Sequence, residues 1–158
     1  MSSENTKKTC WQPLARSFVR LMTLWLWGGF IYYLIELAWR GHSHPSMFAV
    51  GGIAFLCVGA INNCLPWRMA FVWQCAIGGI AVTFLELASG LVLNVWLGLG
   101  VWDYSGLPLN LWGQVVPHFT FAWIGLSAVG IWLDDFLRWK IFDERKPEYR
   151  MMGWKNDG

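Results

Sequence analysis

Charged residues are scarce in this sequence. Lys, Arg, Asp and Glu make up 14% of its 158 residues and apolar residues 56%, whereas about 25% of a soluble domain is charged. So few polar groups cannot cover a water-soluble core, and the high hydrophobicity excludes an intrinsically disordered chain. We therefore expect a small helical membrane protein, because helices satisfy their own backbone hydrogen bonds in lipid.

Several motifs of known chemistry are also absent. The four cysteines, Cys10, Cys57, Cys64 and Cys75, form no Cys-x-x-Cys pair, so we interpret them as small buried apolar residues. No G-x-x-x-x-G-K-[ST] occurs, so the chain has no P-loop for ATP hydrolysis. The basic residues follow no RNA-binding pattern, and no His or Glu spacing favours a metal site. We expect no cofactor, no metal and no nucleic-acid partner.

Four apolar stretches are long enough to cross a bilayer, which takes about 20 residues. They predict transmembrane helices at 18–39, 46–65, 69–93 and 112–134. The fold class expected is all-α, a polytopic four-helix membrane domain over 18–136. It follows an N-terminal segment, 1–17, and precedes a basic amphipathic tail, 137–158.

The basic residues predict the orientation of the chain. Eleven of the twelve lie on one side of the predicted membrane, namely Lys7, Lys8, Arg16, Arg20, Arg68, Arg138, Lys140, Arg145, Lys146, Arg150 and Lys155. Only Arg40 lies on the other side. The positive-inside rule then places both termini in the cytoplasm, and the expected location is the bacterial inner membrane.

The segment that leads into the tail alternates apolar and charged residues. Trp132, Phe136 and Trp139 can share one helix face, with polar cover from Asp134, Asp135, Arg138 and Lys140. This pattern predicts a helix that leaves the bilayer and lies on its anionic inner surface, with Pro147 near its end.

A pattern recurs at a spacing of 50 residues. Residues 28–38 read GGFIYYLIELA and residues 78–88 read GGIAVTFLELA, so Glu36 and Glu86 occupy equivalent places. We expect a two-fold repeat of a helix pair, and membrane repeats commonly build a site at their interface. Glu36 can pair with Arg40 four residues on. Glu86 has no basic residue within a turn, so it is either a protonated residue that serves packing or a functional group. Because ionisable residues within membrane helices are usually functional, we favour the second role.

The predicted outer loop after the third helix carries a dense motif. It reads Trp102-Asp103-Tyr104-Ser105, then Pro108, Asn110 and Gly113, and it follows Glu86 and Gly90. By itself this stretch fits a rigid external loop, because Asp and Asn cap turns and Pro and Gly set the backbone. It also resembles the signature of the ABC-transporter type IV, or CmpB-like, family. That resemblance implies a four-helix membrane fold, a permease-like role and, in an ABC system, a separate ATPase subunit.

Topology places several polar groups at the outer side. We expect an outward-facing pocket whose ligand-binding residues are Glu86, Asp103, Tyr104, Asn110, His118 and Glu36. The residues expected to shape it are Gly90, Trp102, Ser105, Pro108 and Gly113. A carboxylate and an imidazole can bind a cation or relay protons.

Three functions remain open from the sequence. The first is a permease-like protein that binds or moves a small solute or ion, which is not an enzyme. The second is a membrane enzyme that acts on a lipid or polyisoprenoid with an acid/base pair. The third is a non-catalytic subunit of a larger membrane complex. The lipid bilayer is the constant partner, and four helices are few for a solute pathway, so a homodimer or a larger complex is expected.

Overall fold

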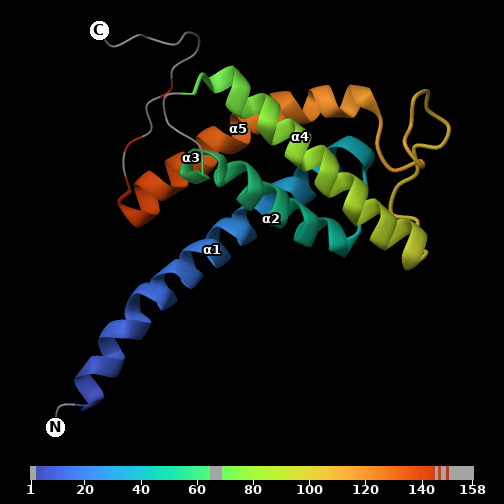
Figure 1. Cartoon of the computed structure of the whole chain (residues 1–158). Helices are drawn as coiled ribbons and strands as arrows, with labels where there is room; N and C mark the ends of the chain where they lie inside the picture. The colour runs from blue at the N-terminus through green and yellow to red at the C-terminus, as the bar shows by residue number, and fades with distance from the viewer. Residues whose placement is uncertain (1–2, 65–68, 145, 147–148, 150–158) are drawn as a thin grey trace, which may run out of the picture.

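The fold is all-helical throughout the part of the chain that the structure describes, as predicted. The computed structural model describes residues 3–64, 69–144, 146 and 149, and side chains from residue 17 onward apart from 62 and 63. Its elements are α1 (Ser3–Arg40), α2 (Pro45–Gly59), the short α3 (Ile61–Cys64), α4 (Phe71–Gly90) with a π-helical continuation (Leu91–Trp96), and α5 (Pro117–Phe142) (Figure 1).

Three helices are long and apolar enough to cross a membrane. They are Ser17–Arg40 within α1, Phe71–Trp96, and Pro117–Phe142. The helix predicted at 46–65 forms only in part, because α2 has 15 residues. At 1.5 Å per residue it spans about 22 Å, less than the roughly 30 Å hydrocarbon core.

The N-terminus of α2 is fixed by its first residues. Pro45 occupies the first turn, where a missing N–H costs nothing. The His44 ring accepts a hydrogen bond from the backbone N–H of Ser46 at 3.2 Å. These two residues set the N-terminal end of α2 close to the predicted start.

The helices pack around α2. The closest packing is of α1 along α2 and of α4 along α5, while α1 and α5 touch at few points (Figure 1). Glycine permits the α4–α5 approach, because a Cβ at Gly79 would lie 2.6 Å from the backbone nitrogen of Ile124. The two closest pairs are those that the repeat hypothesis joins, and the repeat itself stays a prediction.

The C-terminal end of α5 differs from the expected amphipathic pattern. Asp134 is fully buried and Asp135 and Arg138 are each 6% exposed, so the prediction that they provide polar cover was wrong. These polar groups can be buried because they pair with one another. Arg138 donates to the Asp134 carboxylate at 2.5 Å, and the Tyr149 hydroxyl donates to Asp135 at 2.7 Å. Lys140 is exposed as expected.

Beyond this buried cluster the helix stops. Asp143 takes the left-handed conformation, with φ 54°, and its backbone N–H bonds to the carbonyl of Arg138. Glu144 then pairs with Arg20 at 2.6 Å, which ties the end of α5 to α1. Pro147, the link at 65–68 and the tail from 150 onward lie outside the described residues.

Candidate functional site

Glu86 is a buried carboxylate inside a membrane-spanning helix. Its side chain belongs to α4 and the residue is 9% exposed. It accepts a hydrogen bond from the indole N–H of Trp123 on α5 at 2.9 Å and one from the hydroxyl of Tyr104 at 3.4 Å. Among the described residues its direct partners are therefore neutral donors, and no Lys, Arg or His forms an ion pair with it.

Glu36 has a different environment, although it is equally buried at 6% exposed. Its carboxylate pairs with the Arg40 guanidinium at 3.3 Å, as the spacing predicted, and accepts a hydrogen bond from the Ser43 hydroxyl at 2.5 Å. Its charge is thus neutralised within one turn of its own helix. A buried carboxylate with a paired cation needs no further role to explain its place.

Tyr104 stands between the two glutamates. Its hydroxyl donates to Glu86 and accepts a hydrogen bond from the second guanidinium nitrogen of Arg40 at 3.5 Å. Burial, with the nearby Glu86 charge, raises the pKa of Tyr104 to about 12. Tyr104 therefore keeps its proton at physiological pH and remains a donor toward Glu86.

The rest of the motif builds the loop that carries Tyr104. Asp103 is exposed and accepts hydrogen bonds from the backbone N–H and the hydroxyl of Ser105, at 2.8 and 3.0 Å, which lower the pKa of Asp103. The Asn110 amide donates to the carbonyl of Leu107 at 2.7 Å, and its oxygen accepts the N–H of Gly113 at 2.9 Å. These are turn-forming bonds.

Trp102 and Gly90 anchor the loop on α4. Trp102 is 5% exposed, and its indole N–H donates to the carbonyl of Gln114 at 3.0 Å. A Cβ at Gly90 would lie 3.0 Å from the Trp102 ring. Pro108 is exposed in the turn. The motif thus fixes the conformation of the loop, and this conformation places one of its side chains, Tyr104, against Glu86.

The predicted site residues divide into two groups. The structure brings together Glu86, Tyr104 and Glu36, the last through Arg40. It leaves Asp103 and Asn110 in the turn, and His118 is exposed, with its ring 4.3 Å from that of Phe119. Among the described residues, His118 therefore forms no ion pair with a carboxylate.

The sequence did not identify Trp123 as a site residue. It lies in the second turn of α5 but at the middle of the helix predicted at 112–134, whereas transmembrane tryptophans concentrate at the two membrane interfaces. Its central position in that predicted helix was the available signal. Trp123 also stacks on Tyr32 of α1, with ring centroids 6.0 Å apart, so the site draws on three helices and the loop.

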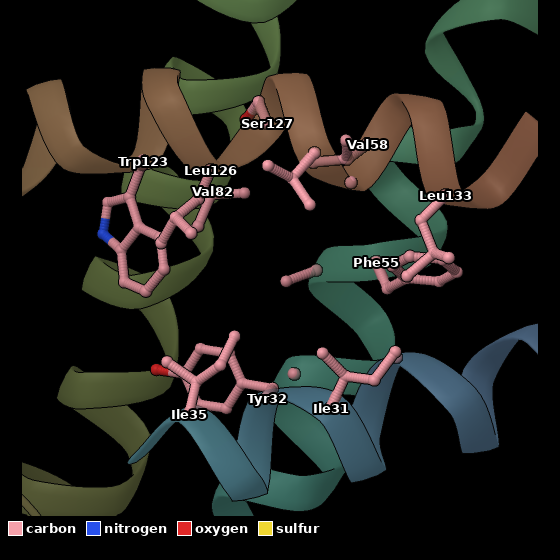
Figure 2. Close-up of a pocket in the computed structure, with 15 residues that line it drawn as sticks. Ile31, Tyr32, Ile35, Phe55, Val58, Val82, Trp123, Leu126, Ser127 and Leu133 are labelled. Carbon is pink, nitrogen blue, oxygen red and sulfur yellow. The ribbon is translucent and has the colours of Figure 1, made fainter. Parts of the chain in front are cut away.

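Two hollows adjoin this group. The one that touches Glu86 has a volume of about 10 Å³, close to the ~10–15 Å³ that one water needs. A larger one, about 110 Å³, lies between α1 and α5 and is almost wholly apolar (Figure 2). Trp123 lines both.

The fold and the site define a class of protein, namely a small multi-pass helical membrane protein with a buried carboxylate beneath an ordered loop. The chain belongs to the family described as "Putative ABC-transporter type IV", whose model matches residues 23–151. This confirms the family resemblance. Neither a curated protein nor a solved structure matches the chain.

Proposed function

We propose that this protein is a permease-like membrane protein that binds and exchanges a small ion, a proton, at Glu86. The observation that carries the proposal is the set of direct partners of this carboxylate, which are the neutral Trp123 and Tyr104 donors. A charged carboxylate costs at least about 2.5–3.5 kcal/mol near the bilayer centre. Both donors can hold the charged carboxylate, and the Tyr104 hydroxyl can instead accept the O–H of the protonated form.

The size of the adjoining hollow favours a proton over a larger solute. About 10 Å³ lies free beside Glu86, and a bound metabolite needs a pocket of roughly 300–1,000 Å³. A proton needs only a neighbouring water or hydroxyl to carry it. The Tyr104 hydroxyl and one water in this hollow would provide that path toward the outer loop.

The comparison of the two glutamates supports Glu86 as the exchanging group. Glu36 is fixed by Arg40 at 3.3 Å, so protonation there would leave the guanidinium hydrogen-bonded only to neutral groups, the Tyr104 hydroxyl and the Val101 carbonyl. Glu86 has no such ion pair among the described residues. The repeat would then hold one structural and one functional carboxylate.

Membership of the family is consistent with a transport system in which a different subunit hydrolyses ATP. The chain has no P-loop, so an ATP-driven system would need a separate ATPase subunit. With both termini in the cytoplasm, as the charge distribution predicts, the Tyr104 loop faces outward and the ATPase would contact the opposite side. A homodimer or a larger membrane complex would provide the remaining transmembrane helices.

The apolar hollow favours a second candidate function. It lies against Trp123, and the indole stands between the hollow and Glu86, so a lipid bound there would reach this carboxylic acid if the ring turned aside. An acid/base step on a lipid or polyisoprenoid would use that arrangement. Conversion of a supplied lipid by the purified protein would favour this function over proton exchange.

Proton flux into vesicles tests the leading proposal. The protein is reconstituted into liposomes that hold a pH-sensitive dye, and a potassium diffusion potential drives protons inward. We expect flux with the wild-type protein and with Glu36→Gln, and its loss with Glu86→Gln, which keeps the volume and most hydrogen bonds. If the flux with each of the three proteins equals that of empty liposomes, the protein would instead be a non-catalytic subunit of a larger membrane complex.

A further inference from the structure

A hydrocarbon-lined hollow lies between α1 and α5. Ile31 and Ile35 of α1 form one wall, Leu126 and Leu133 of α5 form the other, and Phe55 of α2 lies at one end (Figure 2). The hollow has a volume of about 110 Å³. Its lining is hydrocarbon apart from Tyr32, Trp123 and the buried Ser127 hydroxyl. These are too few hydrogen-bonding groups to make water favourable there.

The rim of the hollow lies at membrane depth. Both walls belong to helices long and apolar enough to cross a bilayer, and α1 and α5 scarcely touch along this length. Rim residues are partly exposed, Ile35 at 46% and Leu126 at 40%. In a bilayer these side chains face lipid hydrocarbon, so the hollow opens sideways into the acyl-chain region.

The dimensions select the occupant. A helix of a second copy is about 10–12 Å wide with its side chains, too wide to enter. An apolar cavity of ~150 Å³ holds a benzene ring, so 110 Å³ holds a short stretch of methylene groups, with the rest of the chain along the rim. We propose that this hollow binds one acyl chain of a bilayer phospholipid.

The chain would rest on Trp123. This ring lines the hollow, stacks on Tyr32, and presents its N–H edge to Glu86. A bound chain would therefore hold the indole in the orientation that keeps its hydrogen bond. The chain site goes beyond the proposed proton exchange and does not require it, because Glu86 is not among the residues that line the hollow.

Photolabelling in vesicles tests the proposal. The full-length protein is reconstituted in phosphatidylethanolamine and phosphatidylglycerol, with a trace of phospholipid that carries a diazirine in mid-chain. Labelled residues are identified by mass spectrometry after irradiation. We expect saturable labelling of Ile31, Ile35 and Leu126, above that of Phe84 and Phe121, which are 68% and 73% exposed and lie outside the hollow.

A matched pair of variants extends the test. Leu126→Trp fills the hollow and should reduce labelling of Ile31 and Ile35 to the level of Phe84, whereas Phe121→Trp on the same helix should leave it unchanged. Wild-type labelling already tests the site should Leu126→Trp fail to fold. Labelling of Glu86→Gln should equal that of the wild type, so failure of proton exchange and failure of the chain site are separate results.

Three outcomes would overturn the proposal. The first is labelling of the hollow no stronger than that of Phe84 and Phe121. The second is displacement of the label by a polyprenol but not by excess unlabelled phospholipid, which would assign the hollow to a polyisoprenoid. The third is protection of Ile31 and Ile35 that depends on protein density in the vesicle, which would assign it to a second copy.

Discussion

Replacement of Gly79 by alanine tests the packing that brings Glu86 to Trp123. The new Cβ would lie 2.6 Å from the backbone nitrogen and 2.7 Å from the Cα of Ile124. Ordinary contact begins at 3.4 Å, so α4 and α5 must separate, since a backbone atom cannot rotate away. Gly79 and Glu86 lie two helical turns apart on one face, so this separation also acts on the Trp123–Glu86 hydrogen bond.

Two opposing effects set the magnitude. Alanine is better than glycine in a helix by about 1 kcal/mol, while overpacking costs about 1–3 kcal/mol and here falls on backbone atoms. With the overpacking cost in the upper part of that range, about 2–3 kcal/mol, we expect Gly79→Ala to lower the free energy of unfolding by about 1–2 kcal/mol net. Gly125→Ala is the control, because no atom lies within 4 Å of its added Cβ, and it should be neutral or slightly stabilising.

The assay is unfolding of the purified protein from mild detergent by increasing mole fraction of sodium dodecyl sulfate, followed by far-ultraviolet circular dichroism. Each variant is compared with the wild type in the same micelles. If Gly79→Ala unfolds at the same mole fraction as Gly125→Ala, the close approach of α4 and α5 is wrong, and with it the placement of Trp123 beside Glu86.

Two further predictions concern the outer loop. Gly113→Ala should destabilise the loop, because the residue has φ +69° and a side chain in that conformation costs about 1–2 kcal/mol. Limited proteolysis within 103–113 should therefore be faster in Gly113→Ala than in the control Gly106→Ala, whose added Cβ meets no atom within 4 Å. A cysteine introduced at Ser105, in a background without native cysteines, should react with a membrane-impermeant maleimide in intact cells, whereas one at Lys155 should react only after permeabilisation. The reverse labelling pattern would refute the predicted orientation.

The helical fold followed from composition and apolar run length, because lipid leaves few alternatives. The length of the second helix did not, since its apolar run continues to Trp67 with no charge to mark an end. At the end of α2 the structure places the buried Asp134 of α5 directly against Gly59. Such a contact has no signature in the local sequence.

The site was predictable in its carboxylates but not in their partners. The i,i+4 spacing identified the Glu36–Arg40 pair, and the lack of nearby charge singled out Glu86. Tyr104 was identified by the loop motif, yet the same motif suggested Asp103 and Asn110, whose side chains are used within the turn. Trp123 reaches Glu86 from 37 residues away, and only the packing of α4 on α5 establishes that.

An infrared pH titration of the purified protein in lipid tests the role of Glu86 most directly. A protonated carboxyl group in an apolar setting gives its own carbonyl stretching band, resolved from those of the exposed acids. We expect this band to change with pH in the wild-type protein and in Glu36→Gln, and the change to be missing in Glu86→Gln. A band that persists in Glu86→Gln and vanishes in Glu36→Gln would contradict the proposed role of Glu86 and assign the exchanging proton to the other half of the repeat.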